Sequence, residues 1–260
     1  MMRRILLTTL LVFLAIAALS GCTSVDTYDY GLFLESDPVS ILVLPPLDHS
    51  PEAGASLGCL STVTRPLAER GYYVFPVALV DRMMRDNGLP TPYEMHSVSL
   101  SKLNEVFGVD AVLYLTIEDW GTSYRILSSV TTVQITGRLV DTRSGEVIWA
   151  GGGSARRGSS GGGHLIGALV SAVVRQVATS ISDPSRDVSR AASGSMIRSS
   201  HRGFLYGPYH PRYEADRKKK LDEREKKAKK KKESDEAPGD DTGPDDPDPD
   251  ASDTNPQARS

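Results

Sequence analysis

The stretch Leu19-Ser20-Gly21-Cys22 holds the residues of this chain to which a definite chemical event can be assigned. It ends an apolar run that begins at Ile5, just after two arginines. A basic start, an apolar run and small residues before the cut are the three parts of an export signal. A helix that spans a bilayer needs about 20 apolar residues, and this run is shorter. We therefore interpret the stretch as a lipobox, with cleavage between Gly21 and Cys22 and lipidation of Cys22.

The lipobox pattern resembles the bacterial lipoprotein signal, which implies that Cys22 receives a diacylglycerol group and an N-acyl chain. Several acyl chains anchor a protein stably, because each buried methylene contributes ~0.8 kcal/mol. Thr23 follows the cysteine, and in sorting of the enterobacterial kind the absence of aspartate there implies delivery to the outer membrane. We therefore expect a protein that is attached to the outer membrane through its lipid anchor and faces the periplasm.

The other residue types that commonly do chemistry form no catalytic or metal-binding pattern. Cys59 stands in an apolar stretch, where a buried thiol is inert. The five histidines are His49, His96, His164, His201 and His210. No two of them have the spacing of metal ligands on one helix face, and no pair of nucleophile and base can be assigned. The sequence therefore predicts a protein without a metal, a cofactor or an enzymatic activity.

Arg156 and Arg157 lie in a Gly/Ser-rich stretch, Gly151 to Gly163, between a predicted strand and a predicted helix. Backbone N–H groups at the start of a helix can hold an anion. The stretch lacks the Gly-Lys-Ser/Thr ending of a phosphate-binding loop. We therefore expect a loop that binds an anion through the two arginines, becomes ordered against a partner, or only connects the two elements.

Residues 39–181 have the hydrophobic patterns of one α/β domain. The predicted strands are Ser40–Pro46, Tyr72–Phe75, Asp110–Ile117, Val130–Val140 and Glu146–Ala150. The predicted helices are Ala53–Arg70, Val77–Asn87, Ser99–Phe107 and Leu165–Ile181. The order β-α-β-α-α-β-β-β-α predicts an α/β (α+β) fold, a mixed sheet of about five strands with helices packed on it. The early strands should be parallel, and the last three should form an antiparallel meander.

The segments on either side of this domain lack such patterns. We predict a cleaved signal over residues 1–21, a tether over 22–38, and an extension over 182–213 that packs on the domain or on a partner. The tail, 214–260, contains a basic block and then an acidic block rich in proline. Blocks of this kind bury no core, so we expect the tail to be disordered.

Three sets of residues, taken together, resemble an uncharacterised family of bacterial lipoproteins known from neisserial vaccine-antigen lists. They are the run Leu67–Pro76, the run Gly108–Tyr114 and the hairpin from Asp141 to Trp149. The segment Gly203–Pro211 resembles the C-terminal end of that family. The family is related in fold to the N-terminal domain of TolB and to the CsgG-like outer-membrane lipoproteins. The resemblance covers Cys22 to Tyr213 and carries over no catalytic residues.

This resemblance implies a lipoprotein in an envelope assembly for secretion or transport, with CsgG-like lipoproteins or further copies of the chain as partners. We therefore predict a non-enzymatic interaction protein whose interface is a sheet edge or the last predicted helix. Nucleic acid is not expected as a partner of an exported protein. The alternative is a lipoprotein that binds a small ligand in a pocket at the strand ends.

Overall fold

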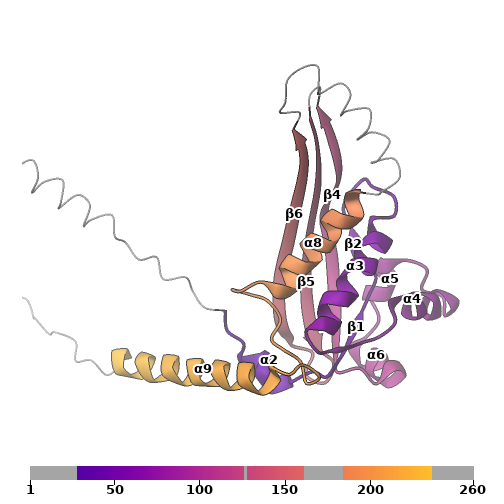
Figure 1. The fold of residues 1–260 in the computed structure, drawn as a ribbon. Coiled ribbons are helices and arrows are strands. Elements are labelled where there is room, and N and C mark those ends of the chain that lie inside the picture. The colour runs from indigo at the N-terminus through magenta and orange to yellow at the C-terminus, as the bar shows by residue number, and fades with distance from the viewer. Residues whose placement is uncertain (1–27, 126–127, 161–183, 236–260) are drawn as a thin grey trace, which may run out of the picture. The chain divides into compact units, whose positions relative to one another are not determined.

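The computed structural model describes residues 28–125, 128–160 and 184–235. Its centre is a six-stranded sheet in the order β3-β1-β4-β5-β6, with β2 paired to β4 (Figure 1). The strands are β1 (Ser40–Val43), β2 (Leu47–Asp48), β3 (Tyr73–Val74), β4 (Ala111–Arg125), β5 (Ser128–Asp141) and β6 (Val147–Ser160). β1 is parallel to both of its neighbours and β2 is parallel to β4, whereas β4, β5 and β6 form an antiparallel meander.

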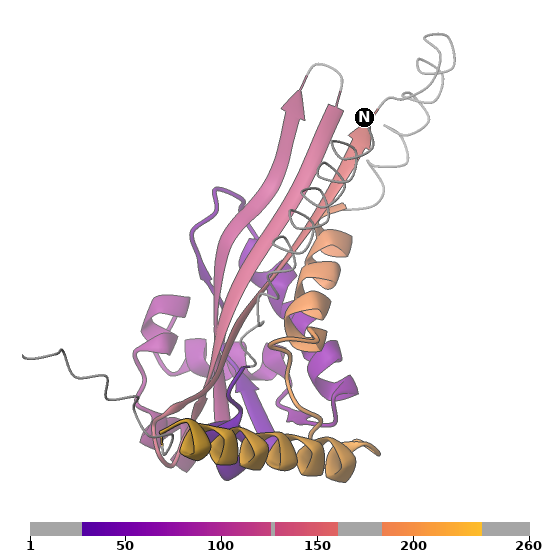
Figure 2. The same cartoon turned by 90° about the vertical axis from the view of Figure 1, so that its left-hand side faces the viewer.

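The meander is much longer than the parallel part of the sheet. β4, β5 and β6 have 15, 14 and 14 residues, whereas the other strands have two to four. β1 pairs with β4 only as far as Leu113, and β2 only as far as Ile117. Figure 2 shows the three long strands continuing past the coloured helices. The far part of the meander therefore has no described strand beside it.

The helices contribute to two hydrophobic cores on opposite faces of the sheet. One core contains residues of α2 (Gly31–Ser36), α3 (Ala55–Glu69) and α8 (Pro184–Arg198). The second, smaller core contains residues of α4 (Val77–Asp86), α5 (Pro92–His96) and α6 (Leu100–Phe107). Neighbouring residues of a strand point to opposite faces, and accordingly Ile41 belongs to the first core and Leu42 to the second.

Local sequence signals determine where several elements begin and end. Ser99 accepts a hydrogen bond from Lys102 N–H at the start of α6, and Gly108 ends that helix with a φ of 63°, a conformation that favours glycine. In the hairpin turn, the Asp141 carboxylate accepts hydrogen bonds from the N–H groups of Arg143 and Ser144, both at 2.8 Å. This turn joins β5 to β6.

The predicted fold class is confirmed. The predicted order β-α-β-α-α-β-β-β is found in β1, α3, β3, α4, α6, β4, β5 and β6. The short elements α2, β2 and α5 are additions to that order. The last predicted helix, Leu165–Ile181, lies outside the described residues.

The tether predicted over residues 22–38 is wrong from Tyr28 onward, because aromatic side chains hold this segment in the first core. Phe33 of α2 is buried and makes edge-on ring contacts with Tyr72 and Phe204, with centroids 6.4 and 6.1 Å apart. Tyr30 donates its hydroxyl hydrogen to the Gly203 carbonyl. The segment after α8 therefore packs on the domain and covers α2.

The disorder predicted from residue 214 is replaced by helix α9 (Tyr213–Asp235). Lysine, glutamate, arginine and alanine are strong helix formers, and opposite charges one turn apart support an exposed helix. The chain divides into two units after Lys220, so α9 begins in the first unit and ends in the second. Within the described ranges, no helix is long and apolar enough to cross a membrane.

Candidate interaction surface

Arg156 and Arg157 lie on strand β6, where they pair with two threonines of β5. The loop predicted over Gly151–Gly163 is therefore wrong as far as Ser160, and the rest of it lies outside the described residues. Neighbouring residues of a strand point to opposite faces. Arg157 lies on the face that carries α8, where its Nη1 is 3.4 Å from Asp187 Oδ2. Arg156 is exposed on the other face.

The glycines that suggested a loop allow α8 to approach β6 closely. A Cβ atom on Gly153 would lie 2.2 Å from the Ala192 carbonyl oxygen and 2.8 Å from Met196 Cβ. Such distances are far below van der Waals contact, so only glycine leaves room for the helix backbone here. The composition of this strand therefore reflects packing against α8.

The outer edge of β6, on the side away from β5, has exposed backbone groups. Ala150 N–H points outward, since it donates to the Tyr28 hydroxyl at 3.0 Å. Pairing with β5 is regular beyond this point, so outward-facing and inward-facing residues alternate. The residues that face outward are therefore Gly152, Ser154, Arg156 and Gly158. All four are exposed, and no described strand pairs with them.

The outer edge of β4 opens at a bulge. β2 covers this edge as far as Ile117, whose carbonyl accepts a hydrogen bond from His49 N–H at 3.0 Å. The register of β4 against β5 shifts between Ile117 and Asp119. Glu118 and Asp119, both exposed, therefore stand where the open part of the edge begins. The sequence prediction ended this strand at Ile117 and so missed the open edge.

Glu118, Asp119 and Arg156 lie on the same face of the meander. The Thr136 hydroxyl donates to Glu118 Oε1 at 2.8 Å, Asp119 pairs with Gln134, and Arg156 pairs with Thr132. Because these three partners are alternate residues of β5, they share one face. This face therefore has two carboxylates at the β4 edge, a guanidinium at the β6 edge, and uncharged polar side chains on β5 between them.

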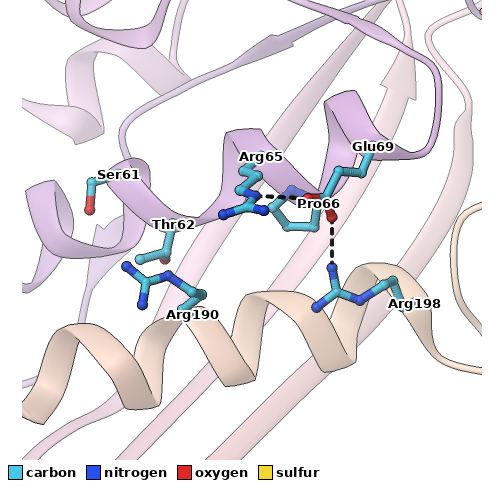
Figure 3. A pocket seen from close by; sticks show the side chains of 7 residues that line it. All are labelled: Ser61, Thr62, Arg65, Pro66, Glu69, Arg190 and Arg198. Carbon is cyan, nitrogen blue, oxygen red and sulfur yellow. Dashed lines mark hydrogen bonds and ion pairs between the residues drawn. The ribbon is translucent and has the colours of Figure 1, made fainter.

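A separate groove of about 350 Å³ lies between α3 and α8 (Figure 3). Its lining residues are Ser61, Thr62, Arg65, Pro66, Glu69, Arg190 and Arg198. Arg65 Nε and Arg198 Nη1 bind the Glu69 carboxylate at 2.7 and 3.1 Å. The hydrogen bond from Arg65 is the main reason why the pKa of Glu69 lies below its ordinary value. Three guanidinium groups line the groove, and their carboxylate partners are Glu69 and, for Arg190, Asp187 at 2.9 Å, so the groove keeps an excess of positive charge.

The buried titratable groups near these surfaces are held in neutral forms. Burial raises the pKa of the Cys59 thiol to about 12, so it is protonated and inert at neutral pH, as predicted. Burial also lowers the pKa of His96, whose Nε2 is 2.8 Å from the Pro45 carbonyl oxygen. Within the described ranges, no group of three or more His, Cys, Asp and Glu residues is arranged to hold a metal ion.

The predicted cleavage and lipidation residues, Gly21 and Cys22, lie outside the described residues. Of the predicted site residues, the structure describes only Arg156 and Arg157. They are neighbours on β6, and their side chains point to opposite faces of the sheet. The acidic β4 edge had one sequence signal, the consecutive acids Glu118 and Asp119 at the end of an apolar strand.

Comparison with known proteins finds a lipoprotein family and a lipoprotein relative. A family model described as "Putative lipoprotein GNA1162-like" matches residues 28–209. A Neisseria meningitidis serogroup B (strain ATCC BAA-335 / MC58) protein described as "Putative lipoprotein NMB1124/NMB1162" is 47% identical over 198 residues, covering 75% of this chain and 92% of that protein. The crystal structure of lipoprotein GNA1162 from Neisseria meningitidis is 49% identical, with a TM-score of 0.45, covering 55% of this chain and 99% of that chain. The PelC dodecamer from Paraburkholderia phytofirmans is 12% identical, with a TM-score of 0.37, covering 67% and 92%.

Proposed function

Because the chain belongs to the GNA1162-like family of lipoproteins, we propose that it is a non-enzymatic interaction component of an envelope assembly for secretion or transport. In this proposal, lipidated Cys22 attaches the protein to the outer membrane on its periplasmic side. The α/β domain then binds protein partners, such as CsgG-like lipoproteins, through an edge of its sheet.

The observation that carries this proposal is the open outer edge of β6. Gly152, Ser154, Arg156 and Gly158 direct their backbone N–H and C=O groups away from β5, and all four are exposed. Unpaired groups in such a row are a template for pairing with another chain. An extended segment that pairs with this edge gains affinity from main-chain hydrogen bonds.

A proline on the outer edge tests the proposal. Ser154→Pro removes an N–H that points outward and leaves the hydrogen bonds to β5 intact, and proline is tolerated on edge strands. We expect crosslinking in membranes, followed by pull-down of the lipidated protein, to recover crosslinked partners from wild type. Ser154→Pro should lose them, and Ser154→Ala should retain them. Equal recovery from the proline variant, or recovery of monomer alone from wild type, would contradict the proposal.

The groove between α3 and α8 favours a second candidate function, the binding of a small acidic ligand. Arg190 lies in this groove and forms an ion pair with Asp187 at 2.9 Å, while the other two arginines share Glu69. A ligand with two carboxylates would raise the melting temperature of wild type more than that of Arg190→Ala. Thermal unfolding with succinate, a dicarboxylate, measures this difference, and inorganic phosphate serves as the comparison anion. Equal shifts for the two proteins would remove the candidate.

A further inference from the structure

The two open edges of the meander complement each other, and we propose that the partner at the β6 edge is a second copy of this chain, bound through its β4 edge. This proposal rests on the interaction function proposed above and specifies the partner. Strand direction, charge and side-chain size support it.

The directions of β4 and β6 allow two copies in the same orientation to join edge to edge. β4 and β6 run the same way, because β5 lies antiparallel between them. A second copy in the same orientation therefore places its β4 beside β6 as a parallel pair, the arrangement that β1 and β4 already have. Each copy keeps one open edge for the next copy. Head-to-tail contacts of this kind build a ring when the rotation closes, and closure removes the open edges.

The charges favour this pairing over the pairing of like edges. Arg156 at the β6 edge and Glu118 and Asp119 at the β4 edge lie on one face, so they meet on the same side of the joined sheet. Among the described residues, Arg156 and Asp119 form no ion pair, whereas Glu118 Oε2 lies 3.7 Å from His49 Nδ1. Two β6 edges would instead bring arginines together, and two β4 edges would bring carboxylates together. Juxtaposed like charges suppress the wrong partner.

The side chains along the β6 edge leave it accessible to another strand. Protein edges are commonly protected by proline, lysine or a bulge. The outward-facing positions here are Gly152, Ser154, Arg156 and Gly158, which include no proline and a single charge. Small side chains allow a second backbone to approach, and the single charge has a complement on the β4 edge.

Charge reversal tests the pairing on the full lipidated chain in detergent, with mass measured by light scattering after gel filtration. Wild type should self-associate. Arg156→Glu alone should weaken self-association at least about tenfold, corresponding to 1.4 kcal/mol, and so should Glu118→Lys/Asp119→Lys. An equal mixture of the two variants should recover self-association, because each contact between unlike copies joins opposite charges. Arg82→Glu, a charge reversal on the exposed side of α4, away from both edges, should leave self-association unchanged.

A disulfide experiment distinguishes the proposed contact from contact between identical edges. Asp119→Cys copies and Arg156→Cys copies carry different affinity tags and are oxidised together with copper phenanthroline. Covalent dimers that carry both tags are expected only from the mixture. Dimers formed by Arg156→Cys alone would show β6 edges paired with each other and would overturn the proposal.

A monomeric wild type would also overturn the proposal. So would a variant mixture that does not recover self-association together with a disulfide experiment that gives no dimers carrying both tags. The proposed function survives that failure if Ser154→Pro still abolishes crosslinking to a different envelope protein. It fails separately if Ser154→Pro changes nothing.

Discussion

At the scale of single residues, Thr62 joins α3 to α8 through a buried hydroxyl network. Its Oγ1 donates to the Cys59 carbonyl at 2.9 Å and lies 2.8 and 3.0 Å from the hydroxyls of Ser189 and Ser193. A hydroxyl has one donor and two acceptor positions, so both serines donate to Thr62. All three side chains are buried.

Replacing Thr62 by valine keeps the shape of the side chain but removes the acceptor of both serines. A buried polar group left without a partner costs about 1–3 kcal/mol. We expect Thr62→Val to lower the free energy of unfolding by that amount in urea denaturation. Thr62→Ser retains the hydroxyl and should lose less. A valine variant as stable as wild type would show that the serines find other acceptors.

Asp141 makes the hairpin turn sensitive to acid. Burial alone would raise its pKa, but hydrogen bonds from the Ser36 hydroxyl, the N–H groups of Ser144 and Arg143, and the Arg143 side chain lower it from 3.8 to about 2. Because the folded pKa is depressed, the stabilisation is fully present above the unfolded value and is lost as the pH falls through the folded value.

Asp141→Asn removes this titration. We expect the variant to be less stable than wild type at pH 7, and the difference in unfolding free energy to shrink between pH 4 and pH 2. Thermal unfolding of both proteins across this range measures the effect. If the difference in unfolding free energy between the two proteins stays constant with pH, the charge of Asp141 does not contribute to stability.

At the scale of elements, helix α8 shows what hydrophobic periodicity misses. Its buried positions repeat at helical spacing, with Val188, Ala192 and Met196 in one row and Ser189, Ser193 and Ile197 in the next. Serine and alanine carry little apolar signal, so the pattern did not indicate a helix. The small residues of α8 face the glycines of β6, and together they allow the helix to pack closely on the strand.

Gly153→Ala tests this close packing. The added Cβ would lie 2.2 Å from the Ala192 carbonyl oxygen, which cannot move without shifting α8. Overpacking a core costs about 1–3 kcal/mol, and we expect at least this loss of unfolding free energy. Gly158→Ala is the matched control on the same strand, because its Cβ would meet nothing closer than 3.8 Å. Equal melting temperatures for the two variants would contradict the packing argument.

At the scale of the whole molecule, the lipid anchor predicted at Cys22 would determine where the proposed interaction surface works. Cys22→Ser removes the thiol that the lipobox predicts as the acceptor of diacylglycerol and leaves the described domain, which begins at Tyr28, unchanged in sequence. We expect the variant to move from the membrane fraction to the soluble or unprocessed fraction on cell fractionation. Thr23→Ser, which keeps the cysteine, should remain with membranes. Membrane association of Cys22→Ser equal to that of wild type would refute the anchor.

The sequence by itself determined the lipobox interpretation, the family, the order of the main strands and helices from β1 to β6, and the hairpin turn at Asp141–Gly145. These features depend on residues that are close together in the chain, where period, capping and turn chemistry act. The tertiary structure decided that Gly151–Ser160 is a strand, that residues 184–198 form a core helix, and that β4 continues past Ile117 to present an acidic open edge. The physical reason is that these features depend on other parts of the fold. The glycine-rich strand β6 is stabilised by the helix α8 that packs on it, and a strand edge is open only when no other strand lies beside it. Both conditions involve residues far apart in sequence.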